Sequence, residues 1–348
     1  MLLQPKVYII LVNYNRWQDT LECLESLFKL NYTNFSIIVV DNASPNNSYQ
    51  YLMDWANGLV QPEVNEEFYR LTGINKQTIP KPIPFLSIYW PDSTSVENND
   101  PQKKIIFIYS NKNLGFAGGN NIAIKFALSQ NDADFFWFLN NDTVVNRDAL
   151  AKIMTFAQEE EIFNSKIMLG TKLLYYKTPA LLQGIGGKYS KWSGLTSHIL
   201  ENTPNASLSL TNINKNEIDY PIGASMFVKK DFIHEVGYMS EDYFLYFEEL
   251  DWAERAKKKG WRIVPFLDCQ IYHKEGGSFG NSKNFKSKLA DFYNLRNRLL
   301  ITRKFFKAYL PLVYLSFIPV IFIRLKRKQF DRIKMIAKIL FRFNEPFR

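Results

Sequence analysis

Three polar residues follow a strongly apolar stretch near the middle of the chain. The stretch FFWFL, residues 135–139, predicts a buried β-strand, and Asn140, Asn141 and Asp142 come directly after it. A hard divalent cation such as Mg²⁺ or Mn²⁺ prefers oxygen ligands and accepts a carboxylate together with phosphate oxygens. Asp142 offers that carboxylate, whereas Asn140 offers a neutral amide. The pattern indicates a metal site at a strand end, with a plain turn as the alternative.

A second acidic group lies in the sequence FEELDW. On a helix, Glu248 and Asp251 are neighbours three residues apart, while Glu249 points about 100° away from Glu248. Carboxylates beside Phe247 and Trp252 suit a general base whose pKa is raised by apolar surroundings. The alternative is that these acids stand at a helix N-terminus and complement its dipole.

Two single residues follow other apolar runs. Asp41 comes after FSIIVV and is suited to hydrogen bonds with a nucleoside, or to capping the next helix. His273 follows QIY and is suited to metal binding or to a contact with a diphosphate oxygen. A polar residue that merely ends a strand is the alternative for His273.

A glycine-rich stretch, NLGFAGGNN, covers residues 113–121. Gly115, Gly118 and Gly119 permit close backbone approach, and N–H groups at a helix start favour phosphate or sugar oxygens. The stretch matches neither the Walker sequence nor GxGxxG. A tight strand-to-helix connection is the alternative.

The elements that must position these residues begin with a β-α-β pattern. Residues 7–12 and 35–40 are apolar and β-branched, and residues 17–30 carry apolar side chains at helical spacing. This unit predicts a right-handed crossover in a doubly wound sheet, where ligands bind beyond the C-terminal strand ends. The residues at those two ends are Asn13, Tyr14, Asn15, Asp41 and Asn42.

The remaining chain predicts an insertion, more α/β elements and a helical extension. Residues 60–104 are rich in proline and scattered acids, which is typical of a long insertion. The elements expected after it are strands at 104–110 and 134–139, a helix at 147–164, a strand in IMLGTKLLYY, loops and hairpins over 183–220, a strand and short helix from Gly223, a helix closed by Gly260, and a strand ending near His273. We expect a catalytic domain over residues 1–290 and an extension over 291–348.

The composition is that of a globular protein with a basic C-terminal region. Of the 348 residues, 46% are hydrophobic and 22% charged, and the formal net charge is +9. Such a basic region can meet nucleic acid, anionic lipid or a phosphorylated substrate. The two cysteines, Cys23 and Cys269, lack metal-binding spacing and are expected to be reduced core thiols of a cytosolic protein.

The apolar stretch AYLPLVYLSFIPVIFI, residues 308–323, lies between basic clusters. It is shorter than the about 20 apolar residues of a standard spanning helix and contains two prolines. A packed helix pair is one interpretation. We favour a segment lying on a membrane, because cations beside aromatic and aliphatic side chains suit anionic headgroups and do not indicate nucleic acid.

The order of the motifs is more specific than any one of them. LVNYNR, VVDNAS, NLGFAGGNN, FLNNDT, GASMFVKK, YFLYFEELDWAERAKKKGW and IYHKEGGS follow one another. Together they resemble the family-two inverting glycosyltransferases of the GT-A fold, and among these the bacterial rhamnosyltransferase-like branch. The resemblance covers roughly residues 6–300, apart from the insertion. It implies an α/β fold in which a mixed, Rossmann-like sheet is flanked by helices.

The resemblance also implies roles for particular residues. The residues expected to bind the nucleotide-sugar donor are Val12, Asn13, Tyr14, Asp41, Asn42, Gly115, Gly119, Asn120, Asn140, Asn141, Gly223 and Ala224. The family's Asp-x-Asp motif falls on Asn140–Asp142, where only Asp142 keeps the acid. Asp142 and His273 are the expected ligands of Mg²⁺ or Mn²⁺. Glu249 takes the position of the general base, and Asp251 is its expected support.

The reaction implied is a single displacement that inverts the sugar. The expected donor is dTDP-rhamnose, with a UDP-sugar carrying galactose, glucose or an N-acetylhexosamine as the alternative. The expected acceptor is a glycan or lipid-linked glycan destined for O-antigen, capsule or another surface polysaccharide, met at the inner face of the cell membrane. Other classes left open are a nucleotidyltransferase and an inactive protein that binds nucleotide sugars.

Overall fold

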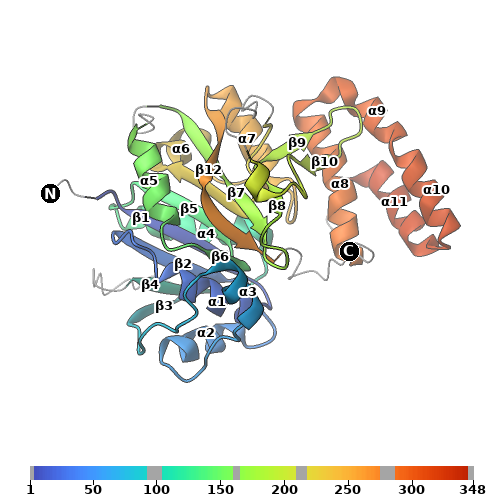
Figure 1. The fold of residues 1–348 in the computed structure, drawn as a ribbon. Helices are drawn as coiled ribbons and strands as arrows, with labels where there is room; N and C mark the ends of the chain where they lie inside the picture. The colour runs from blue at the N-terminus through green and yellow to red at the C-terminus, as the bar shows by residue number, and fades with distance from the viewer. Residues whose placement is uncertain (1–3, 92–103, 160–164, 209–217, 275–286, 344–348) are drawn as a thin grey trace.

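A mixed β-sheet forms the centre of the molecule (Figure 1). The computed structural model describes residues 4–91, 104–159, 165–208, 218–274 and 287–343. Within them the sheet has ten strands in the order β3-β4-β2-β1-β5-β11-β7-β12-β6, with β8 paired to β7. The strands are β1 Val7–Asn13, β2 Phe35–Asp41, β3 Phe85–Trp90, β4 Ile105–Ser110, β5 Phe135–Asn140, β6 Thr143–Val145, β7 Ile167–Tyr175, β8 Leu182–Gly184, β11 Ser225–Lys229 and β12 Arg262–His273. A separate hairpin consists of β9 Gly187–Tyr189 and β10 Thr196–His198.

The parallel half of the sheet confirms the predicted β-α-β unit. β1 lies between β2 and β5 and is parallel to both. The register pairs Asn13 with Asp41 and Val12 with Asn140. Three of the predicted strand ends therefore lie side by side, at the edge where parallel sheets bind ligands.

The other half of the sheet brings His273 to the same region. β11 runs antiparallel between β5 and β7, and β12 is parallel to β7. The short strand β6 pairs antiparallel with β12 and places Thr143 opposite His273. This register sets His273 next to the residue that precedes Thr143, which is Asp142.

Helices cover both faces of the sheet. Alternate residues of β1 face two different cores, with Ile9 in one and Ile10 in the other. The first core is covered by α1 Trp17–Leu27, α2 Ser48–Ala56 and α5 Ala149–Glu159, and the second by α4 Gly115–Ser129, α6 Lys230–Val236 and α7 Glu248–Lys258. Cys23 and Cys269 are buried and free, as expected for core thiols.

The predicted insertion, residues 60–104, is more structured than its proline content suggested. It contributes α3 Glu66–Thr72 and the edge strand β3, which is parallel to β4. Residues 92–103 lie outside the described part of the chain. The sequence FLSIYW forms β3 because its aromatic and β-branched residues lie beyond the last proline of the cluster at 80–84, where backbone donors are again available.

The C-terminal extension is helical, as predicted. It consists of α8 Lys288–Phe305, α9 Leu310–Leu315, α10 Phe317–Lys326 and α11 Phe330–Arg342. The predicted boundary after residue 290 falls within the first turn of α8. This helix serves both units, since Ile301 packs in the main core while Leu299 packs in a separate C-terminal core. The packing thus makes α8 the connection between them.

The apolar stretch of the extension is longer than the sequence analysis allowed. The helical run Lys307–Lys326 has 20 residues, and its most apolar window has a mean hydropathy of 1.9. By length and composition it is long enough to cross a membrane, and it is the one such run in the described residues. The two prolines did not shorten it, because Pro311 lies in the first turn of α9 and Pro319 near the start of α10, where the N–H would lack a helical partner.

A strained loop, residues 243–247, precedes α7 and contacts α8 of the extension. Phe244, Tyr246 and Phe247 all have positive φ, which is costly for residues with a side chain. The side-chain amide of Asn297 on α8 donates to the carbonyls of Tyr243, Leu245 and Tyr246 at 2.8–3.0 Å. α7 begins directly after this loop, so Asn297 holds the segment that positions the predicted base.

Replacing Asn297 with alanine should destabilise the protein. The substitution leaves carbonyls of a strained, mostly buried loop without a donor, which costs about 1–3 kcal/mol of unfolding free energy. Chemical denaturation measures the change. Gln158→Ala, at an exposed helical position, is the matched control and should behave as wild type. An Asn297→Ala protein as stable as the control would show that the loop does not need this amide.

Candidate functional site

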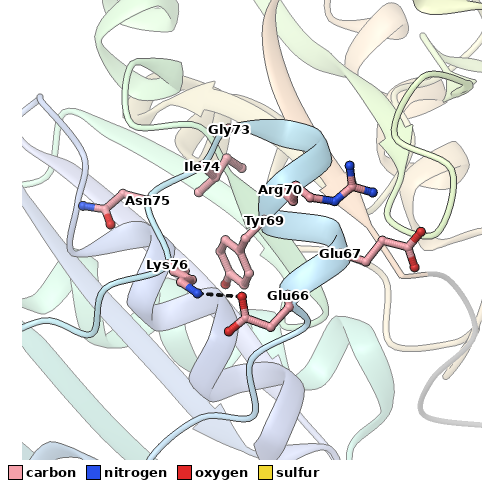
Figure 2. A pocket seen from close by; sticks show the side chains of 8 residues that line it. All are labelled: Glu66, Glu67, Tyr69, Arg70, Gly73, Ile74, Asn75 and Lys76. Carbon is pink, nitrogen blue, oxygen red and sulfur yellow. Dashed lines mark hydrogen bonds and ion pairs between the residues drawn. The ribbon is translucent and has the colours of Figure 1, made fainter.

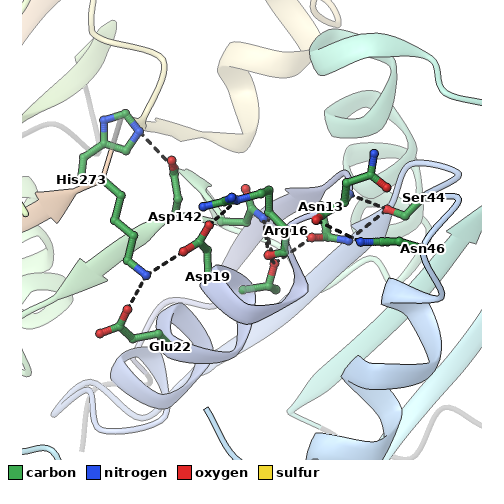
Figure 3. A network of polar contacts seen from close by, with 12 residues as sticks. Asn13, Arg16, Asp19, Glu22, Ser44, Asn46, Asp142 and His273 are labelled. Atoms are coloured by element: carbon green, nitrogen blue, oxygen red, sulfur yellow. Dashed lines mark hydrogen bonds and ion pairs between the residues drawn. The ribbon is translucent and has the colours of Figure 1, made fainter. Parts of the chain in front are cut away.

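A network of amides joins the ends of β1, β2 and β5 (Figure 3). Asn13 donates to a carboxylate oxygen of Asp41 at 2.7 Å. Asn141 donates to the side-chain oxygen of Asn13 at 3.2 Å and to the hydroxyl of Thr20 at 2.8 Å. Thr20 was not predicted, and it links the start of α1 to both asparagines. The predicted donor residues Asn13, Asp41 and Asn141 thus form one buried cluster.

The carboxylate of Asp41 is held by a turn and by the side chain of Asn13. One carboxylate oxygen accepts from the backbone N–H of Ser44 at 2.9 Å, which is turn chemistry. The other oxygen accepts from Asn13. Burial raises the pKa of Asp41, and the hydrogen bonds from Ser44 and Asn13 oppose that rise. The turn fixes the carboxylate at the strand end where a nucleoside would be recognised.

The glycine-rich stretch is held by Asn42. The side chain of Asn42 accepts from the N–H of Leu114 at 3.0 Å and donates to the carbonyl of Gly115 at 2.9 Å. Gly115 has φ +71°, and a Cβ there would lie 2.3 Å from the carbonyl oxygen of Phe244. Close packing against Phe244 therefore requires this glycine, which supports the tight strand-to-helix connection.

The other members of that stretch also pack within the protein. A Cβ on Gly119 would lie 2.7 Å from Val12, so the helix α4 lies directly against the end of β1. The side chain of Asn120 donates to the carbonyl of Phe116 at 2.9 Å. The structure thus brings the predicted donor residues Val12, Gly119 and Asn120 to the same strand end through packing.

Asp142 and His273 form a carboxylate–imidazole pair. Nε2 of His273 lies 3.1 Å from a carboxylate oxygen of Asp142 and 3.2 Å from the amide nitrogen of Asn140. Nδ1 of His273 lies 2.8 Å from the side-chain oxygen of Gln183 on β8. An imidazole that donates from Nδ1 to Gln183 presents its Nε2 lone pair toward Asp142, and second-shell contacts of this kind orient metal-binding histidines.

The pair fits a divalent cation. Two electron-rich atoms facing each other at 3.1 Å are stabilised by a shared proton or by a cation between them. Burial would raise the pKa of Asp142, but a protonated His273 and the charge of Lys274 hold it below its usual value when no cation lies between Asp142 and His273. No cluster of three or more His, Cys, Asp or Glu side chains suited to a metal occurs in the described residues. Phosphate oxygens would therefore have to complete the coordination.

Glu248 and Glu249 divide their roles by environment. Glu248 is buried, and one of its carboxylate oxygens has no hydrogen-bond partner. Burial and the neighbouring charge of Glu249 raise the pKa of Glu248 well above its usual value. Glu249 is only partly buried, and burial raises its pKa to about 7. With a pKa near neutrality, Glu249 can take up and release a proton at pH 7, which suits a general base.

Gly223 and Ala224 lie between Glu249 and the Asp142–His273 pair. A Cβ on Gly223 would lie 3.6 Å from the carboxylate carbon of Glu249, so this backbone passes in front of the base. The carbonyl of Ala224 accepts from the N–H of Asn140 at 3.0 Å. Since Asn140 contacts His273, short links join Glu249 to the carboxylate–imidazole pair.

Asp251 is occupied by structural contacts. Its buried carboxylate accepts from Tyr243 at 2.9 Å and forms ion pairs with Arg255 at 2.7 Å and Lys304 at 2.5 Å. None of these partners is a predicted site residue. The contacts join α7 to α8, and they give no support to a direct part for Asp251 in proton transfer.

Sequence reasoning missed the ion cluster beside Asp142. Lys274 forms ion pairs with Asp19 at 2.7 Å and with Glu22 at 2.5 Å, and Asp19 also binds Arg16 (Figure 3). Asp19 and Glu22 lie on one face of α1, but their partner is distant in sequence. The i,i+3 spacing of two acids on an otherwise buried helix was the available signal.

A cavity of about 760 Å³ lies beside α3 (Figure 2). Its lining includes Glu66 and Lys76, which form an ion pair at 2.6 Å, and also Tyr69 and Arg70. No predicted site residue lines it. The cavity is therefore separate from the residues gathered at the strand ends.

The fold matches that of GT-A glycosyltransferases. A family model described as Glycosyl transferase family 2 matches residues 8–68 and 92–172. The matched residues lie in the first half of the chain, and they include the strand ends at Asn13, Asp41 and Asp142.

Relatives of this kind were found among curated proteins and solved structures. The chain is 23% identical over 208 residues to the low-salt glycan biosynthesis hexosyltransferase Agl10 of Haloferax volcanii, covering 58% of this chain and 61% of that protein. The mannosyltransferase PcManGT of Pyrobaculum calidifontis, in complex with GDP-Man and Mn²⁺, has a TM-score of 0.50 at 12% identity, covering 97% of this chain and 86% of that one. GalNAc-T7 with UDP, GalNAc and Mn²⁺ has a TM-score of 0.54 at 11% identity, covering 87% and 48%. The structures establish a shared fold, and the chain spans less than two thirds of the length of Agl10.

Manganese binding should depend on Asp142 and on its support. Mn²⁺ titrated into protein with UDP or dTDP, followed by electron paramagnetic resonance of free Mn²⁺, measures the affinity. Asp142→Asn should abolish nucleotide-dependent binding, and Gln183→Met should weaken it by about 10–100-fold because His273 loses its orienting partner. Asp148→Asn, at a surface position, should bind as wild type. Unchanged binding by Asp142→Asn would place the metal elsewhere.

Proposed function

We propose that the protein is an inverting glycosyltransferase that moves a sugar from a nucleotide-diphospho-sugar to a hydroxyl of a glycan acceptor. One observation carries the proposal. A partly buried carboxylate with a pKa of about 7, Glu249, is linked through Gly223–Ala224 and Asn140 to the Asp142–His273 pair. A proton acceptor near a diphosphate-binding corner is what such a transfer needs.

The donor would lie across the ends of β1, β2 and β5. Asp41 and Asn13 would recognise the nucleoside, and Asn42 would hold the glycine-rich turn against it. Asp142 and His273 would hold a divalent cation, which supplies positive charge to the diphosphate when bound. Two structural relatives support this arrangement. One is a complex with GDP-Man and Mn²⁺, and the other is a structure with UDP, GalNAc and Mn²⁺.

Glu249 would act on the acceptor. Its carboxylate removes the proton from an acceptor hydroxyl as that oxygen forms a bond to the anomeric carbon. The bond from the anomeric carbon to the diphosphate breaks on the opposite face, and the nucleoside diphosphate leaves with its electron pair. This single displacement inverts the sugar and needs no covalent enzyme intermediate. The raised pKa of Glu248 favours its neutral form, which limits repulsion between the two carboxylates.

The donor sugar we favour is rhamnose from dTDP-rhamnose, on the resemblance of the motifs to the rhamnosyltransferase-like branch. A UDP-sugar remains the second candidate, because a structural relative carries UDP and GalNAc. The buried carboxylate–imidazole pair and the raised pKa of Glu249 argue against an inactive binding protein. The acceptor we favour is a lipid-linked glycan at the inner face of the membrane, on the basic, apolar extension.

A donor panel tests the proposed activity. Purified protein with Mn²⁺ or Mg²⁺ is incubated with dTDP-rhamnose, UDP-glucose, UDP-galactose, UDP-GlcNAc and GDP-mannose, and slow hydrolysis and thermal stabilisation are recorded. We expect dTDP-rhamnose to give the largest response, and the response to disappear with a chelator. A response to a UDP-sugar alone would replace the donor, and silence with every nucleotide sugar would refute the function.

The rate of transfer should follow the protonation of Glu249. Because burial raises its pKa to about 7, the basic form is scarce at pH 6 and dominant at pH 8, so the rate should rise through about pH 7 and then level off. Glu249→Gln should lower the rate about 10²–10⁴-fold and still bind the nucleotide. Glu254→Gln, on the same helix, is the matched control. A wild-type rate that is flat from pH 6 to 8 would remove Glu249 from the base role.

A further inference from the structure

The hairpin β9–β10 touches the C-terminal helices at its tip. Trp192 and Tyr309 make an edge-to-face contact with ring centroids 5.2 Å apart. A Cβ on Gly194 would lie 3.1 Å from Val313, so the turn of the hairpin lies directly against α9. Figure 1 shows the same approach, with the β9–β10 connection reaching the helices of the extension.

Buried Arg298 ties the two together. Its guanidinium donates to the carbonyl of Ser193 on the hairpin at 2.5 Å and to the hydroxyl of Ser316 between α9 and α10 at 2.6 Å. Ser316 also donates to the carbonyl of Ser193 at 3.1 Å. The hairpin tip and the α9–α10 helices are therefore held as one unit.

This unit carries exposed apolar side chains on both of its parts. Trp192 is 65% exposed and Leu195 53% exposed at the hairpin tip. On the helices the exposed apolar residues are Leu312, Leu315, Ile318, Phe322, Ile323 and Leu325. Leu315, Ile318 and Phe322 follow at steps of three and four, so they share one helix face. Only 11% of the most apolar window of Lys307–Lys326 is buried, so most of this window has no covering partner within the described residues.

The charges around this face are positive. Lys191 at the hairpin and Lys307, Lys326, Arg327 and Lys328 on the helices are exposed, and the sequence has no acidic residue between Asp291 and Asp331. A soluble protein partner gains little from a wholly cationic rim. An anionic bilayer matches it, since lipid headgroups meet the cations while apolar and aromatic side chains enter the interface.

The opposite end of the hairpin lies beside the proposed base. Gly187 of β9 exchanges backbone hydrogen bonds with Tyr220, at 2.8 and 3.4 Å. The chain continues from Tyr220 through Pro221 and Ile222 to Gly223, which lies in front of Glu249. One short hairpin thus spans from the apolar surface to the acceptor side of the site.

We propose that the hairpin tip and the exposed face of α9–α10 form one surface that binds an anionic lipid bilayer, and that the hairpin leads a membrane-held acceptor to Glu249. The inference rests on the proposed function for the identity of Glu249. The surface itself is defined by Trp192, Leu195, Leu315, Ile318 and Phe322, with the basic residues at its rim. In this proposal the hairpin contacts the membrane together with the C-terminal helices.

Vesicle binding tests the surface without any substrate. Full-length protein is sedimented with vesicles of phosphatidylglycerol and phosphatidylcholine, and with vesicles of phosphatidylcholine alone. We expect binding to the anionic vesicles and little to the neutral ones. Leu195→Asp and Phe322→Asp should each weaken binding about tenfold or more. Each substitution removes an apolar side chain that would enter the bilayer and adds a negative charge that the anionic headgroups repel. Leu71→Asp, a leucine equally exposed at 53% on α3, should bind as wild type.

Any other result of the vesicle experiment would contradict the proposal. Anionic binding that survives Leu195→Asp but not Phe322→Asp would exclude the hairpin. Wild-type protein that binds neither vesicle, or binds both equally, would exclude an anionic bilayer, and self-association through this face in light scattering would assign it to a second copy. Donor hydrolysis measured on the same samples separates the two inferences, since it should persist in Leu195→Asp whether or not lipid binding does. If the wild-type protein hydrolyses the donor but does not bind vesicles, the proposed function stands and the proposed membrane surface is refuted.

Discussion

The strained loop at residues 243–247 is the constraint on which the candidate site depends. Its left-handed backbone is unfavourable for aromatic residues and persists because neighbours on both sides hold it. On one side the carbonyl of Phe244 accepts from Phe116 and occupies the space that a side chain on Gly115 would need. On the other side Asn297 satisfies its carbonyls. The donor-side turn, the base helix and the C-terminal extension therefore meet at one loop.

The surroundings of the three carboxylates, Asp142, Glu248 and Glu249, shift their pKa values differently. Asp142 stays charged because His273 and Lys274 offset its burial, which suits a residue that binds a cation. Glu249 lacks such a partner, and its pKa rises toward neutrality. Burial and the charge of Glu249 raise the pKa of Glu248 as well. Similar side chains obtain three different roles from their surroundings, which is how one site can hold a diphosphate and accept a proton at the same pH.

The parts of this arrangement that could be predicted from sequence are those with local signals. Apolar runs predicted β1, β2, β5 and β12, and polar residues at their ends predicted most of the cluster around Asn13 and Asp142. Gln183, Thr20 and Lys274 could not be predicted, because their contacts arise from strand register and helix packing between distant segments. The edge strand β3 was not predicted because it follows a proline cluster. Proline indicates where backbone hydrogen bonding in a sheet is interrupted, but it does not indicate where a strand begins again.

The central claim is that the donor diphosphate lies at the strand ends between Asp41 and the Asp142–His273 pair. Crystals grown with Mn²⁺ and a nucleoside diphosphate, measured at the manganese absorption edge, locate the metal directly. The account predicts one strong anomalous peak within coordination distance of Asp142 and His273, with the nucleoside beside Asp41. A peak elsewhere with nucleotide bound, or nucleotide density in the cavity beside α3, would contradict it.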